Sequence, residues 1–176
     1  MVSTSLTAIN DAVLASVKKA FPAINVYSYD EACFDDSSVS TPACLFELSE
    51  INFGSDRGDG RYPAECEFFI HCVIGYKNSS QENSISKEVR EFAAAIAQHV
   101  WNSGIWVEGG VLDRPARIQI SPGNFRHLSE HGYESWIVEW DQTVYLGRSF
   151  WNADGIRPVE VAFSARGDGY AELSGI

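Results

Sequence analysis

The stretch AECEFFIHCVIGY, residues 64–76, decides the fold. Every second side chain in it is apolar, which is the pattern of a strand that turns one face to a hydrophobic core. The side chains on that face are Ala64, Cys66, Phe68, Ile70, Cys72 and Ile74. At about 3.3 Å per residue the strand spans roughly 43 Å, whereas a compact chain of 176 residues has a radius of gyration of about 16 Å. We therefore expect this strand to cross the whole domain or to project beyond it.

A helix and two strands are predicted before this stretch. The helix begins after Thr4 or Ser5, either of which can cap it, and stops before Pro22. Its apolar residues recur every three or four positions and are Leu6, Ile9, Val13, Val17 and Ala20. Residues 24–29 alternate and are rich in β-formers, so they predict a short strand, and residues 43–51 predict a second one.

A second helix and two more strands are predicted after it. The helix begins at a cap, Asn83 or Ser84, and Gly104 is available as its left-handed stop. One face of this helix holds Ile85, Val89, Phe92, Ile96 and Val100. Residues 116–120 predict a short strand, and residues 134–146 a long alternating one. The long strand gathers Trp136, Val138, Trp140, Val144 and Leu146 on one face.

Together these elements predict an α+β fold in the order α-β-β-β-α-β-β, with a single, mostly antiparallel sheet packed by two helices. We expect the second helix to cover the sheet face that bears the two tryptophans of the last strand. The predicted core residues are Phe92, Ile96, Trp136, Val138 and Trp140. Residues 1–147 are expected to form this domain.

Residues 148–176 are interpreted as a C-terminal arm, because their composition changes to Gly, Ser, Asp and Arg. They hold one short alternating segment, Val159, Val161 and Phe163. An isolated strand leaves its backbone groups unpaired, so we expect the segment to pair with an edge of its own domain or with the next subunit. The candidate subunit-interface residues are therefore these three and Trp151.

Composition excludes several classes of function. Hydrophobic residues make up 45% of the chain and charged residues 21%, which is ordinary for a folded protein. The formal net charge of -11 and the scattered basic residues argue against a nucleic-acid reader. No segment has the length and apolarity of a membrane span or the pattern of a signal peptide. The four cysteines show no CxxC spacing, so reduced thiols in a reducing cytoplasm are expected.

No catalytic, metal or cofactor site is predicted. Among the histidines, His71 projects to the face opposite Cys66 and Cys72, and His127 and His131 lie in a polar loop. His99 is likewise not interpreted as a catalytic or metal-binding residue, and His127 and His131 are interpreted as surface histidines. The Gly-rich segment with Asp56 and Asp59 lacks the remaining ligands of a calcium loop, and no nucleophile elbow, phosphate loop or zinc pair occurs. Cys66 and Cys72 are roughly 20 Å apart on one strand, too far for a disulfide.

One enzymatic alternative stays open. Strand positions of one parity share a face, so His71, Glu65 and Glu67 could line a common pocket. A strongly perturbed carboxylate in that pocket would favour a small enzyme.

Five stretches resemble the Mu-like phage tail terminator family, whose fold is similar to that of the lambda-type tail terminator. In chain order they are PACLFELSEI, GDGRYPAECEFFIHCVIGYK, EVREFAAAIAQHVW, ARIQISPGNF and GYESWIVEWDQTVYLG. The resemblance covers about residues 6–147, rests on the order and spacing of these stretches, and is looser in the arm.

The resemblance implies a non-enzymatic structural subunit of a hexameric ring that ends tail-tube polymerisation and joins the tail to the head side. Its implied partners are further copies of itself, the tail tube protein or the sheath, and neck or connector proteins. Its implied place is the virion, with the host cytoplasm during assembly. A monomeric neck adaptor of similar fold is the alternative within this class.

Overall fold

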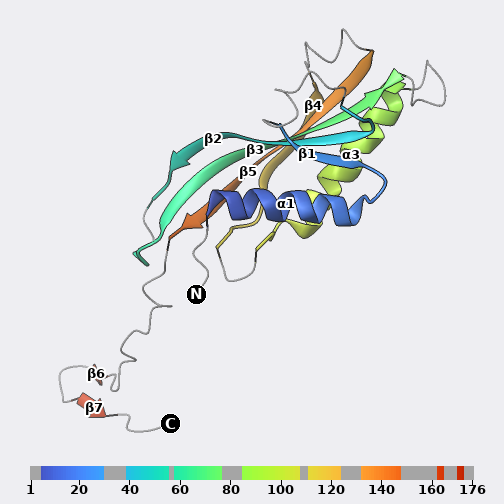
Figure 1. Cartoon of the computed structure of the whole chain (residues 1–176). Helices are drawn as coiled ribbons and strands as arrows, with labels where there is room; N and C mark the ends of the chain where they lie inside the picture. The colour runs from blue at the N-terminus through green and yellow to red at the C-terminus, as the bar shows by residue number, and fades with distance from the viewer. Residues whose placement is uncertain are drawn as a thin grey trace.

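A five-stranded sheet forms the centre of the computed structural model (Figure 1). The structure describes residues 5–29, 39–55, 58–76, 85–107, 111–123 and 132–147, and the backbone of 162–164 and 170–172. The strands are β1 (Asn25–Ser28), β2 (Ala43–Phe53), β3 (Tyr62–Gly75), β4 (Ala116–Pro122) and β5 (Tyr133–Leu146). Their order in the sheet is β1-β2-β3-β5-β4, and all pairs are antiparallel except β1 with β2.

Both helices lie on one face of this sheet, below it in Figure 1. Helix α1 (Leu6–Ala20) begins at Ser5, whose side chain accepts a hydrogen bond from the backbone N–H of Ala8. Helix α3 (Ile85–Ser103) presents Val89, Ala93, Ile96 and Val100 to the core. The predicted α+β class and the order α-β-β-β-α-β-β are confirmed. Neither described helix combines the length and apolarity needed to cross a membrane.

An aromatic stack runs across the helix-covered face of the sheet. The ring of Phe68 on β3 stacks on Phe46 of β2 and on Trp140 of β5, with centroids 5.6 and 5.4 Å apart. Trp106, which follows α3, lies 6.3 Å from Trp140. Phe46, Phe68 and Trp140 are all buried, so this stack lies inside the core.

The predicted core residues all lie in this layer, at different depths. Ile96, Val138 and Trp140 are buried. Phe92 and Trp136 are half-buried. Both pack against a small buried cluster at the border of the core, which consists of Ile74, Ile85 and Val89. Ala93 is the α3 residue that is fully buried next to Phe92, because its small side chain lets the helix approach the sheet closely.

Gly104 does not act as a left-handed helix stop. It is absent from the positive-φ glycines, which in the described residues are Gly58, Gly60, Gly132 and Gly147. A Cβ atom at Gly104 would instead lie 2.2 Å from Cγ of Pro115. Glycine is therefore required here because the chain leading into β4 passes directly against the end of α3.

The arm segment finds its strand partner within the arm. Strand β6 (Ala162–Ser164) pairs antiparallel with β7 (Tyr170–Glu172), and Phe163 stands opposite Ala171. The segment around Phe163 thus has a strand partner in its own chain that was not predicted from the sequence, and its pairing with a domain edge or the next subunit stays a prediction. Trp151, Val159 and Val161 lie outside the described residues.

Candidate functional site

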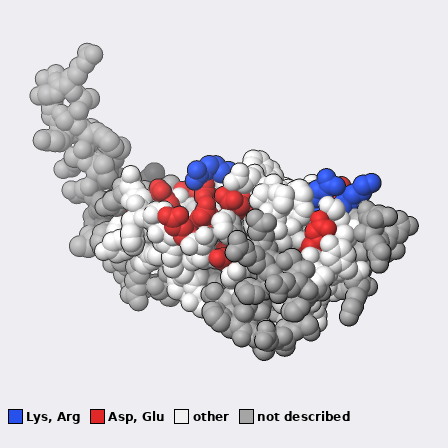
Figure 2. Space-filling model, turned by 90° about the horizontal axis from the view of Figure 1, so that it is seen from above, with Lys and Arg blue, Asp and Glu red and all other residues white. Residues whose placement is uncertain are grey.

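The sheet face opposite the helices carries a group of carboxylates. Residues directly opposite one another in antiparallel strands share a face, and Glu67 of β3 stands opposite Glu50 of β2 and Asp141 of β5. Glu65 lies one row further along, between Asn52 and Thr143. Figure 2 looks down on this face and shows Asp and Glu gathered in one area of it.

These side chains line a shallow depression of about 420 Å³. Arg114 and Arg117 lie on the β4 side of it, and the Nε of Arg117 donates a hydrogen bond to Asp141. Burial raises the pKa of Glu67, and the negative charges of Glu139 and Glu50 raise it further. The depression is therefore electronegative. Within the described ranges, however, no three His, Cys, Asp or Glu side chains are grouped so as to hold a metal ion.

His71 does not belong to this depression. Its Nε2 shares a 2.8 Å hydrogen bond with Oε2 of Glu47, and its ring lies 5.1 Å from the ring of Tyr29. Burial lowers the pKa of His71, while the bond to Glu47 opposes this effect. The structure therefore brings Glu65 and Glu67 together in one depression and places His71 in a separate, buried contact with β2.

His99 links the two helices. Its Nε2 lies 3.0 Å from Oγ of Ser16 on α1, and its ring contacts Phe21 and Trp106. His99 is half-buried, and this burial lowers its pKa. The contact between Ser16 and His99 links α1 to α3. Neither residue lines the carboxylate-lined depression.

Two of the buried thiols are neighbours that sequence reasoning did not pair. Cys44 on β2 stands directly opposite Cys72 on β3, and both are free and buried. Burial raises the pKa of Cys72, with a further contribution from Cys44. Burial also raises the pKa of Cys66 to about 11. Thiols with raised pKa values stay protonated and are poor nucleophiles and metal ligands.

The remaining candidates divide between the turn before β3 and undescribed segments. The carboxylate of Asp59 accepts hydrogen bonds from the side chain and from the backbone N–H of Arg61, at 2.8 and 3.0 Å. It therefore serves the turn in which it lies. His127, His131, Cys33 and Asp56 lie outside the described residues.

Sequence reasoning missed a set of exposed apolar side chains. Phe53 and Tyr62, at the ends of β2 and β3, are 77% and 68% exposed. Figure 1 shows these strand ends reaching beyond α1, so no described helix covers them. Ile51, Trp101, Ile105 and Ile120 are also exposed. The sequence signal was available for Phe53 and Tyr62, because they flank a Gly-rich turn at the far end of two strands.

No protein-family model matches the chain, and no curated protein matches it.

Proposed function

We propose that this chain is a structural subunit of the phage tail terminator type. It forms a hexameric ring on the end of the tail tube, stops the polymerisation of the tube and joins it to neck or connector proteins. It has no catalytic centre, needs no cofactor, and belongs to the virion after assembly in the host cytoplasm. The tail tube protein, or a sheath around it, is the partner on the other side.

The main support for the proposal is that the stretches resembling the terminator family coincide with the helices and strands of the fold. The five stretches that resemble the terminator family coincide, in order, with β2, β3, α3, β4 and β5. Each therefore corresponds to a whole element of one domain rather than to a scattered motif. The fold that the resemblance implies, a sheet packed by two helices, is also the fold of this chain.

The surface chemistry supports an assembly role. Exposed aromatic side chains in a patch favour a protein contact, and Phe53 and Tyr62 provide one at the projecting end of the sheet. The acidic sheet face would repel DNA at short range. A ring through which DNA passes benefits from a surface that does not retain it.

A small enzyme is the second candidate. It is favoured by the depression on the open face of the sheet, in which the pKa of Glu67 is raised. The separation of His71 from Glu65 and Glu67 weakens it, because the imidazole base that this alternative invoked lies outside the depression. The monomeric neck adaptor shares the fold and differs from the ring subunit in mass.

Native mass spectrometry and electron microscopy of the purified protein, alone and with tail tube protein, test the proposal. We expect a sixfold mass and rings on tube ends, and tubes of uncontrolled length when the protein is left out. A protein that stays monomeric with tubes present would favour the adaptor. Turnover abolished by Glu67→Gln would establish the enzyme.

A further inference from the structure

Besides the four-residue outer edge of β1, the sheet has two longer strand edges that no described strand covers. Strand β2 has 11 residues, and β1 pairs with only four of them, Ala43–Phe46. The outer edge of Glu47–Phe53 is thus left without a strand partner among the described residues. At the other side of the sheet, β4 pairs with β5 alone. Uncovered edges present rows of backbone N–H and C=O groups that can pair with another strand.

Both edges expose apolar side chains on the helix side of the sheet. On β2, Ile51 and Phe53 stand opposite the core residues Cys66 and Ala64, so they point to the helix side, yet they are 40% and 77% exposed. On β4, Ile120 stands opposite the buried Val138 and is 38% exposed. If the two edges were joined, these apolar side chains would meet on one face.

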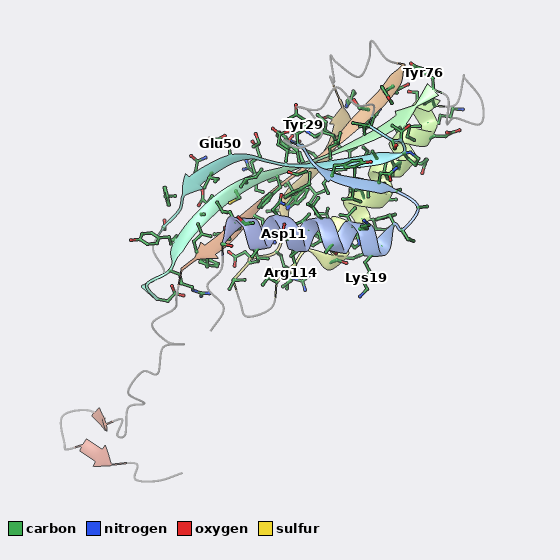
Figure 3. The ribbon with its side chains drawn as sticks, viewed as in Figure 1. Asp11, Lys19, Tyr29, Glu50, Tyr76 and Arg114 are labelled. Carbon is green, nitrogen blue, oxygen red and sulfur yellow. The ribbon has the colours of Figure 1, made fainter. Side chains whose placement is uncertain are left out.

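The other faces of the two edges carry opposite charges. Glu47 and Glu50 lie on the open side of β2, because they stand opposite Phe69 and Glu67. Figure 3 shows Glu50 on the side of β2 away from α1. On the open side of β4, the side chain of Arg117 is 82% exposed while it contacts Asp141. Joining the edges would therefore place an exposed cation on the side of the sheet that carries the Glu47 and Glu50 carboxylates.

We propose that the free edge of β2, Glu47–Phe53, pairs with β4, Ala116–Pro122, of a second copy of this chain. The inference rests on the proposed ring and names the contact that builds it. The contact is head to tail, since it joins two different surfaces, and such a contact repeated around an axis gives a ring when the rotation closes and a filament when it does not.

The direction of pairing follows from the symmetry. A head-to-tail repeat keeps both the face and the strand direction of the sheet. Because β4 runs opposite to β2 within one copy, β4 of the second copy is antiparallel to β2. The four residues of β1 occupy the first part of the edge, so the incoming strand lies beyond them. The copies are consequently staggered along the strands, as strands are in closed barrels.

Charge reversal tests the contact. Glu50→Lys and Arg117→Glu change exposed side chains, so each variant should keep its fold, checked by circular dichroism. Each alone places like charges in the contact and should weaken assembly about tenfold or more, measured by mass photometry over a dilution series. An equimolar mixture of the two should assemble again, because alternating copies restore opposite charges at every contact. Glu91→Lys, an exposed position on α3, is the matched control and should assemble as the unchanged chain does.

A second pair of variants tests the apolar side. Ile120→Asp should weaken assembly, whereas Ile105→Asp, which is exposed but lies on neither edge, should not. Rings that are unaffected by Glu50→Lys, Arg117→Glu and Ile120→Asp would overturn the inferred contact and leave the ring proposal standing. An unchanged chain that forms no rings, with or without tail tube protein, would overturn the ring proposal and this contact with it.

Discussion

Gln142 is a buried polar side chain that ties three parts of the chain together. Its Nε2 donates to the carbonyl oxygens of Gly104 and Asp113, at 2.5 and 2.7 Å. Its Oε1 accepts from the indole N–H groups of Trp106 and Trp140, at 3.1 and 3.2 Å. The connection between α3 and β4 is thereby held against β5.

Replacing this side chain by one of similar size should be costly. Gln142→Leu leaves two indole donors and two carbonyl acceptors without their partner, and each buried unsatisfied group costs about 1–3 kcal/mol. We expect a loss of at least about 3 kcal/mol, or roughly 6–12 °C in melting temperature. Gln98→Leu, an exposed glutamine on α3, is the control. Equal melting temperatures for the two variants would show that water replaces these bonds.

His71 makes stability depend on pH. Its pKa in the folded chain is lowered from 6.5 by burial, although Glu47 opposes the shift. A lowered pKa means that unfolding takes up a proton, so the stability is present above the unfolded value of 6.5 and is lost as the pH falls through the folded pKa. We expect the melting temperature to fall between about pH 7 and pH 5, and to fall less steeply in His71→Gln. The same slope in both chains would assign the effect elsewhere, with the half-buried His99 the first alternative.

At the scale of elements, α3 owes its place to one apolar face. Ile96 is fully buried in that face, and Lys87 lies on the opposite, exposed side of the same helix. Ile96→Ala should leave a cavity and cost about 2–5 kcal/mol, whereas Lys87→Ala should change stability by less than about 0.5 kcal/mol. Urea denaturation measures both. Similar midpoints for the two variants would place a different face of α3 on the sheet.

Periodicity predicted the elements because each one buries a single face. The alternation in residues 64–76 and the three-to-four spacing from Ile85 to Val100 are local signals, and both became elements of the expected type. The parallel pairing of β1 with β2 is not a local signal, because it joins strands separated by residues 29–42. The role of Gly104 depends on Pro115, a contact that sequence spacing cannot reveal.

The candidate site was predictable only in part, for a reason of register. Parity alone placed Glu65 and Glu67 on one face. Strict alternation from Glu47 would put Glu50 on the helix side, but the register shift between Leu48 and Glu50 brings it opposite Glu67. The carboxylates of three strands are grouped because of this bulge and because of the order of the strands in the sheet. Neither feature can be predicted from the alternation of residues in a single sequence.

At the scale of the whole molecule, the described strands form two sheets. The five-stranded sheet and both helices end by Leu146, and among the described residues β6 and β7 pair with each other. Among the described residues, the side chains that build the core all precede Gly147. We therefore expect the domain to fold without residues 148–176.

A chain that ends at Gly147 tests how assembly divides between the domain and the arm. Because the described core residues all precede Gly147, we expect circular dichroism and a melting temperature close to those of the full chain. Because the inferred contact joins β2 to β4, both of which are retained, we also expect the shortened chain to form rings at a similar concentration. Glu50→Lys in the full chain is the complementary variant, with an intact arm and a reversed edge charge. A shortened chain that is folded but monomeric, together with a full-length Glu50→Lys variant that still forms rings, would move the assembly contact from the sheet edges to the arm.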